Sequence, residues 1–239
     1  STDGSTQYRG YNVPNAISRF DAVDWSTNDR YNPHAVVLDD QTCVLTYQKN
    51  TGSAYTVVTR VRSSTSTSFA SAVVVHTQSS APSSAINARF CPRLLKLPDS
   101  SLLLYFFSES GDLGQVVCYR SSDNGASWTQ ISPGVLPEPI DISGSDGWEL
   151  EDLRVAYGDG QVCMIVCVES LGSTSGTYIQ YASDSGGITF SLIEGPELTG
   201  AGDGNGESID LVYANGSFVV FQALASSAAT GYVRFIRLG

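Results

Sequence analysis

The sequence predicts an all-β fold built from repeated four-stranded antiparallel units, the arrangement of β-propeller blades. Two observations predict it. A turn flanked by apolar strands recurs four times along the 239 residues. The apolar residues alternate or form short runs and never follow a 3.6-residue period, which is typical of strands. A fixed repeat made of strands indicates an array of like supersecondary units.

The recurring turns are evenly spaced. Their anchor residues stand 59, 60 and 56 positions apart, at Asp40, Asp99, Asp159 and Asn215. In each repeat we expect the first two strands to flank this turn. A third strand is expected to follow, over 55–62, 115–120, 177–181 and 232–236.

A second turn precedes the fourth strand, and its best example has the pattern S-x-D-x-G-x-S-W, the Asp box, with Ser121, Asp123, Gly125, Ser127 and Trp128. We expect the aspartate to accept from backbone N–H groups two and three residues further on. We expect the glycine to supply a positive φ, and the tryptophan to plug the loop where the fourth strand starts. The alternative is an ordinary D-x-G hairpin turn followed by an exposed Ser-Trp pair.

Two other repeats keep a loop at this place. Residues 183–190 are interpreted as a box with one extra residue, in which Asp184, Gly186 and Phe190 replace the aspartate, glycine and tryptophan. Residues 63–69 keep the loop position without its aspartate and glycine. The recurrence favours the box over the isolated hairpin turn.

The ends of the chain predict how the array closes. The fourth repeat stops after its third strand, and the strand-like segment 6–13 precedes the first repeat. Pairing of the two would close a four-bladed ring without an open edge. The alternative is a part of a larger ring, cut or completed by another chain. We predict a single domain over 1–239, with blade repeats at about 30–78, 89–133, 149–194 and 206–239.

Composition excludes several functions. The net charge of −11, with lysine only at 49 and 96, argues against nucleic acid and anionic membranes. No apolar run reaches the length of a membrane span, so we expect no membrane insertion. Abundant Ser, Thr and Gly are common in extracellular and virion proteins, so we expect a secreted or virion-surface location. A start at Ser1 without a signal peptide indicates a processed protein or an excised domain.

Metal and cofactor sites are not predicted. The five cysteines form no C-x-x-C pair, and four of them fall in apolar strands, which favours buried free thiols over zinc ligands. Asp203, Asn205 and Glu207 alternate with glycine and loosely resemble a calcium loop. Their spacing is incomplete, so a glycine-rich loop is the preferred interpretation and calcium the alternative.

Asp boxes on repeated four-stranded units, with a first strand of the form P-x-L-L-x-L-P-D-x-x-L-L-L at 92–104, resemble the sialidase (neuraminidase) superfamily over about 30–239. The resemblance implies a propeller. That family usually has six blades, whereas this chain supplies four. Asp-box propellers also include non-catalytic glycan binders, sorting receptors and structural proteins, so the resemblance implies the fold more directly than the activity.

The chemistry implied by the resemblance is an arginine triad that binds a carboxylate, a Tyr–Glu nucleophile pair and an Asp acid/base. The segments 30–33 and 89–92 resemble the first arginine motif, but with arginine and aromatic transposed. In a strand, that shift turns the arginine to the other face unless a bulge intervenes. Glu151 and Glu207 match the place of the catalytic glutamate. No arginine stands where the second one of the triad is expected, so the triad is incomplete.

First-strand starts line the central funnel of a propeller, and their side chains are the candidate ligand-binding residues. Besides Glu151 and Glu207, these are Arg30, Arg89, Trp148, Glu149, Asp152, Asp203 and Asn205. Trp148 would stack on a sugar, and the charged groups would bind a polar ligand. The alternative is a salt-bridged, water-filled channel mouth that only holds the blades together.

Two functions follow. The first, which we predict, is a non-catalytic recognition or structural module that binds a glycan or glycoprotein surface, as a homo-oligomer or within a larger assembly. The second is a sialidase-like exo-glycosidase that uses a funnel glutamate and a tyrosine.

Overall fold

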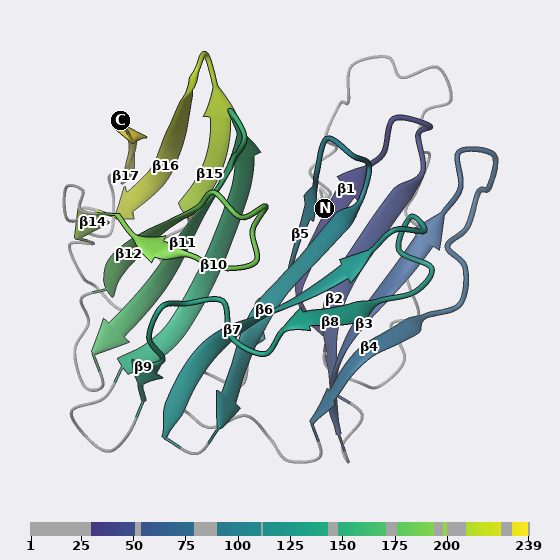
Figure 1. Ribbon diagram of the computed structural model, residues 1–239, viewed down its shortest axis with the longest axis horizontal. Helices are drawn as coiled ribbons and strands as arrows, with labels where there is room; N and C mark the ends of the chain where they lie inside the picture. Colours follow the sequence, from purple (N-terminus) through teal and green to yellow (C-terminus); the bar gives the residue numbers. More distant parts are fainter. Residues whose placement is uncertain are drawn as a thin grey trace, which may run out of the picture.

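The computed structural model describes residues 30–50, 54–78, 90–110, 112–142, 148–170, 176–193, 198–199, 209–225 and 231–238. Every regular element within these ranges is a β-strand, so the all-β prediction is confirmed (Figure 1). Among the same residues, no helix is long and apolar enough to cross a membrane. The predicted closing strand 6–13 lies outside the described residues.

The strands form four antiparallel sheets. The first contains, in order, β1 (Arg30–Val37), β2 (Cys43–Asn50), β3 (Tyr55–Arg62) and β4 (Val73–Gln78). The second contains β5 (Arg93–Lys96), β6 (Leu102–Ser110), β7 (Leu113–Ser121) and β8 (Thr129–Ser132), with β9 (Ile140–Asp141) also paired to β7.

The third sheet contains β10 (Trp148–Gly158), β11 (Gln161–Ser170), β12 (Gly176–Ser183) and β13 (Ser191–Leu192), with β14 (Leu198–Thr199) also paired to β12. The fourth contains β15 (Ile209–Ala214), β16 (Ser217–Ala225) and β17 (Gly231–Leu238). Each sheet is thus a run of strands consecutive in sequence, as the repeat predicts.

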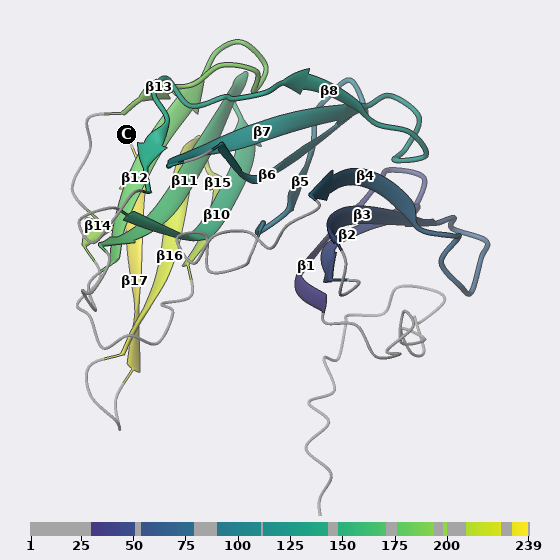
Figure 2. The same cartoon turned by 90° about the horizontal axis from the view of Figure 1, so that it is seen from below.

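The sheets stand side by side in an arc, with their first strands on its inner side (Figure 2). Contacts between consecutive sheets join β1 to β5, β5 to β10 and β10 to β15. This arrangement places equivalent positions of the repeat beside one another along the inner strands, and those positions carry the candidate site.

The four anchor turns have two different local structures. In the first two sheets, Asp40 and Asp99 accept from the backbone N–H two residues on, both at 2.9 Å. In the last two, Asp159–Gly160 and Asn215–Gly216 have positive φ at both residues, as a two-residue type I′ hairpin requires. The sequence therefore sets strand register locally in all four repeats.

The core has two parts, separated by the third sheet. The larger lies among the first three sheets and includes Phe106, Leu150 and Met164. The smaller lies between the third and fourth sheets and includes Ile165 and Ile209. Because β11 is buried on both faces, it is a nearly continuous apolar run instead of an alternating one. All five cysteines are buried free thiols, as predicted.

The 121–128 turn has most of the predicted hydrogen bonds, with one correction. The Asp123 carboxylate accepts from Ser127 N–H, four residues on and not two or three, at 2.8 Å, and from Ser127 Oγ at 2.5 Å. Ser121 Oγ accepts from Gly125 N–H at 2.8 Å, and Gly125 has the expected positive φ of 85°. The Trp128 indole donates to Thr59 Oγ1 of the first sheet at 3.0 Å, so the turn also docks onto the neighbouring sheet.

The 183–190 turn has a different register from the predicted one. Gly187 N–H donates to Ser183 Oγ at 3.0 Å, and Thr189 N–H donates to Ser185 Oγ at 3.0 Å. Ser185 therefore takes the place of the aspartate and Gly187 that of the glycine, and no residue is inserted. Asp184 is exposed and accepts from the Gln161 side chain at 2.7 Å. The assignment of Asp184 and Gly186 to the box was wrong. In this turn the Ser185 hydroxyl accepts the backbone hydrogen bond that the Asp123 carboxylate accepts in the 121–128 turn.

The corrected register gives a test on two adjacent glycines with positive φ. A Cβ at Gly187 would stand 2.1 Å from the Tyr105 hydroxyl, whereas a Cβ at Gly186 would meet nothing within 4 Å. Gly186→Ala should cost about 1 kcal/mol from backbone strain alone. Gly187→Ala should cost about 3 kcal/mol or more, because packing against the second sheet is lost as well. Urea unfolding of both variants measures the difference, and equal losses would refute this register.

Candidate functional site

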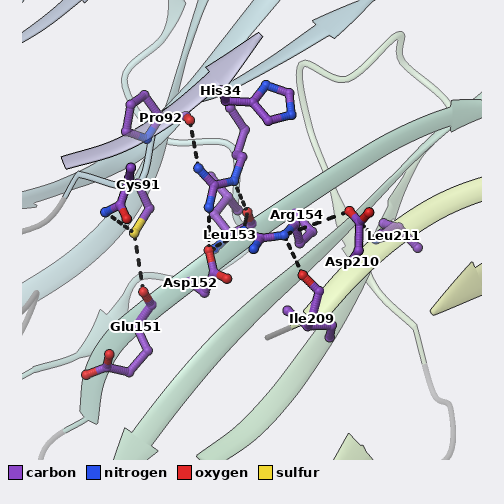
Figure 3. Close-up of polar contacts among 12 residues, drawn as sticks. His34, Cys91, Pro92, Glu151, Asp152, Leu153, Arg154, Ile209, Asp210 and Leu211 are labelled. Atoms are coloured by element: carbon purple, nitrogen blue, oxygen red, sulfur yellow. Dashed lines mark hydrogen bonds and ion pairs between the residues drawn. The ribbon is translucent and has the colours of Figure 1, made fainter. Parts of the chain in front are cut away.

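A row of polar contacts links the inner strands (Figure 3). At one level of the repeat, the Asn32 amide donates to Cys91 Sγ and the Cys91 thiol donates to the Glu151 carbonyl, both at 3.3 Å. Asn32 and Cys91 both have positive φ, at 52° and 45°. Non-glycine residues rarely adopt this conformation, and the surrounding contacts must hold it.

Two arginines join the inner strands a few residues after Cys91 and Glu151. Arg93 of β5 donates to the Leu153 carbonyl of β10 and to the Asp152 carboxylate, both at 2.7 Å. Arg154 of β10 donates to the same carboxylate oxygen and, at 2.6 Å, to the Ile209 carbonyl of β15. Asp152 is therefore the shared partner of both guanidinium groups, and the three residues connect the second, third and fourth sheets.

The electrostatics of this level follow from burial and from the two arginines. Burial and the Arg154 charge lower the pKa of Arg93, while Asp152 opposes that shift. His34 of β1 accepts from Leu94 N–H through Nδ1 at 3.2 Å. Burial, followed by the Arg93 and Arg154 charges, lowers the pKa of His34 to about 4. His34 is thus neutral at pH 7.

Asp152 was predicted to bind a ligand, and its described partners are the two arginines and a backbone N–H. These contacts agree with the alternative interpretation of the funnel, in which salt bridges between inner strands hold the sheets together. Sequence reasoning missed Arg93, Arg154 and His34. A closer alignment of the repeats would have found two of them, because His34 and Arg93 both stand six residues before their anchor turns.

A different group of side chains lies where β10 begins and β11 ends. Glu149, Glu151 and Glu169, called here the carboxylate cluster, are half-buried and bring carboxylate oxygens within 4.8 Å of one another. Glu149 lies directly opposite Glu169 across the strand pair. The register shifts between Leu150 and Asp152, so Glu151 is the residue at the bulge.

The surroundings of Glu149 and Glu169 favour the protonated form of each carboxyl group. Partial burial, followed by the Glu151 and Glu169 charges, raises the pKa of Glu149. Partial burial and the Glu151 charge raise the pKa of Glu169. Like charges directly opposite each other in a sheet are destabilising. Stability therefore does not explain this arrangement, which offers acceptors for ligand hydroxyl groups, a carboxylic acid that can donate a proton, or oxygen ligands for a cation.

The structure brings only some of the predicted funnel residues together. Glu149 and Glu151 meet in the carboxylate cluster, joined by Glu169, which the sequence analysis missed. Trp148 is partly buried against the main core, and Arg30 is described only as a strand residue opposite Lys49. The remaining predicted positions lie outside the described residues: Arg89, Asp203, Asn205 and Glu207.

The bulge explains why Glu169 was missed. Counting back from the Asp159–Gly160 hairpin, Gly158 pairs with Gln161 and Asp152 with Cys167. In an uninterrupted ladder Glu169 would then lie opposite Leu150, and Glu149 opposite Ser170. The extra residue at Glu151 moves Glu149 opposite Glu169 instead. No local pattern in the sequence signals this bulge.

The sequence matches no known protein family and no curated protein. Its structure resembles a family 117 glycoside hydrolase of the marine bacterium Zobellia galactanivorans (TM-score 0.59, 12% identity, 88% of this chain and 67% of that one). It also resembles the GH93 alpha-L-arabinofuranosidase of Fusarium graminearum (0.55, 10%, 86% and 62%). A third match is fructan 1-exohydrolase IIa of Cichorium intybus (0.53, 13%, 87% and 41%).

At these identities the likeness shows the fold alone, that of propeller glycoside hydrolases. In the first three repeats, four consecutive strands form an antiparallel sheet as predicted, and the described part of the fourth repeat contains three strands. The comparisons bear on the sialidase resemblance at the level of the fold alone. The chain spans about two thirds or less of the length of each of these proteins.

The shared role of Asp152 gives a testable contrast with a second aspartate. Asp152→Asn leaves two half-buried or buried guanidinium groups without their carboxylate and should destabilise the fold by about 3 kcal/mol or more. Asp210 is exposed and 4.0 Å from Arg154, so Asp210→Asn should change stability by less than about 1 kcal/mol. Chemical denaturation at pH 7 measures both. Similar losses would show that Asp152 does not tie the inner strands together.

Proposed function

We propose that this protein is a glycan-binding module on a propeller of the glycoside hydrolase type, and that the carboxylate cluster binds the glycan. The observation that carries the proposal is the meeting of Glu149, Glu151 and Glu169 at the start of an inner strand. Ionised carboxylates accept several hydrogen bonds each, and the hydroxyl groups of a sugar supply the donors. A neutral, hydroxyl-rich ligand also relieves the crowding of like charge by donating to these oxygens.

The fold comparison supports a carbohydrate ligand without deciding the chemistry. The GH93 structure is a complex with arabinobiose, and the fructan exohydrolase structure is a complex with 1-kestose. Both are sugars bound to proteins with this sheet architecture. The acidic, lysine-poor composition is consistent with a neutral glycan, because the net charge of −11 would repel a strongly anionic partner.

Hydrolysis is the second candidate function, and one specific observation favours it. Carboxyl groups of retaining glycosidases stand about 5 Å apart, and one of them acts as an acid with a raised pKa. The close oxygens of the carboxylate cluster and the raised pKa values of Glu149 and Glu169 match that requirement. Against it, the positions equivalent to Glu151 on the first two sheets are Asn32 and Cys91, which bond to each other. We therefore prefer binding.

The remaining parts of the proposal concern context. We propose that the four sheets are blades, that the 121–128 and 183–190 turns are an Asp box and a serine variant of it, and that the protein acts at an extracellular or virion surface. The hydrogen bonds of both turns and the Ser-, Thr- and Gly-rich composition support these points. A partner glycoprotein, a second copy or a larger assembly would complete the binding surface.

Glycan-array screening followed by calorimetry tests the preferred function. We expect a neutral glycan to bind, and Glu149→Gln and Glu169→Gln to weaken binding at least tenfold each through loss of charge-assisted hydrogen bonds. Asp184→Asn is the matched control: it removes the same charge from the end of β12 that lies away from Glu169, and it should bind as the parent does. Equal weakening in all three variants would point to a general charge effect.

A panel of aryl glycosides separates binding from hydrolysis. Binding without turnover supports the preferred function. Turnover supports the hydrolase if Glu149→Gln or Glu169→Gln abolishes it. In that case the activity should also fall as the pH rises above the raised pKa of the carboxyl group that acts as the acid. A protein that neither binds nor cleaves any member of either panel overturns both.

A further inference from the structure

We infer that the contact between the first and second sheets is an acid-sensitive interface, in which protonation of two histidines releases the first sheet from the second. The chain has two histidines, His34 on β1 and His76 on β4, at the inner and outer strands of the first sheet. Both contact the second sheet. An interface that carries every histidine of the chain differs from the rest of the molecule in its response to mild acid.

At the inner end of the interface, His34 accepts a hydrogen bond through a ring nitrogen that acid would protonate. Its Nδ1 accepts from Leu94 N–H of β5, and that residue is 2% exposed. An imidazolium has no acceptor nitrogen, so protonation leaves this buried N–H without its partner. The charged groups facing His34 are Arg93 and Arg154, which share Asp152. A third positive charge at this point is repelled.

At the outer end, His76 is packed among aromatic rings of the second sheet. Its ring centroid lies 5.2 Å from Phe106 and 6.0 Å from Phe90, and Tyr119 Oη is 3.4 Å from His76 Nδ1. Tyr119 is the titratable group facing it from β7. The one charged residue of β6 is Glu109, whose carboxylate accepts from the Gln78 amide at 3.1 Å.

On its own sheet, His76 pairs with Val57 of β3. Among the described residues, no ion pair is formed by His76. Burial alone lowers its pKa, so charging this ring is also unfavourable in the folded state.

The sign of the pH dependence follows from these two sites. A histidine whose folded pKa lies below the unfolded value of 6.5 supports the fold above pH 6.5 and loses that support as the pH falls toward its folded pKa. For His34, with a folded pKa of about 4, the unfolding constant of the first sheet should rise about twentyfold from pH 7 to pH 5. His76 adds to this. Glu149 and Glu169 have the opposite effect, because their raised pKa values favour the fold in acid.

A local reporter separates the two effects. The Trp128 indole donates to Thr59 Oγ1 across the same interface at 3.0 Å, far in sequence from both histidines. Release of the first sheet breaks this bond and shifts the indole N–H resonance. Since Asn32 of the first sheet is bonded to Cys91 beside Glu151, the same release loosens one wall next to the carboxylate cluster.

The experiment is an NMR titration of the full chain between pH 7.5 and 4.5, with the Trp128 indole identified by its absence in Trp128→Phe. We expect the indole signal to shift below pH 6.5, and both histidine rings to titrate below that value. The double variant His34→Asn/His76→Phe keeps an acceptor near Leu94 and a ring among the aromatics. Between pH 7 and pH 5, the unfolding constant of this variant should rise at least tenfold less than that of the parent protein.

Three results would overturn the inference. The first is a histidine pair that titrates at or above pH 6.5 in the parent protein, a readout that needs no variant to fold. The second is a double variant that keeps the full acid sensitivity of the parent. The third is a double variant that loses the acid sensitivity although the Trp128 indole signal of the parent protein does not shift, because the change would then lie outside this interface.

Discussion

The Asp152 carboxylate between Arg93 and Arg154 is the interaction on which the centre of this protein depends. Both arginines also donate to backbone carbonyls of a neighbouring inner strand. A guanidinium has several donors in a fixed plane, so one side chain can bind a carboxylate and a carbonyl of different sheets together. Inner strands of consecutive sheets have no backbone ladder between them, and these side chains provide the polar connection that a ladder would otherwise give.

The same rigidity positions the carboxylate cluster. Asp152 follows directly after the bulge at Glu151 and binds Arg93, and the Cys91 thiol donates to the Glu151 carbonyl. The bulge is therefore held by two contacts from the second sheet. A site that crowds three carboxylates needs such support, because the repulsion among them would otherwise straighten the strand or separate the side chains.

Inter-sheet packing relies on the small turns as much as on the apolar core. Trp128 reaches back to the first sheet, and the Tyr105 hydroxyl of the second sheet donates to the Gly187 carbonyl at 2.8 Å. In both turns a glycine with positive φ lets the loop approach a neighbouring sheet closely. The two turns thus give the second and third sheets a specific position on the sheet before each of them, which apolar surfaces alone do not.

The sequence by itself determined the elements whose causes are local: strands from alternating and apolar runs, hairpins from Asp-Gly and Asn-Gly, and four repeats from the even spacing of Asp40 to Asn215. It also marked Glu149, Glu151 and Asp152 as residues of interest. Only the tertiary structure decided their roles. A single bulge brought Glu149 opposite Glu169. Arg93, 59 positions away in the sequence, joined Arg154 as a partner of Asp152. Ser185 replaced the expected aspartate because its hydroxyl accepts the same backbone hydrogen bond that Asp123 accepts in the 121–128 turn. Register shifts and contacts between repeats arise from packing across sheets, and the pattern of a single strand does not encode them.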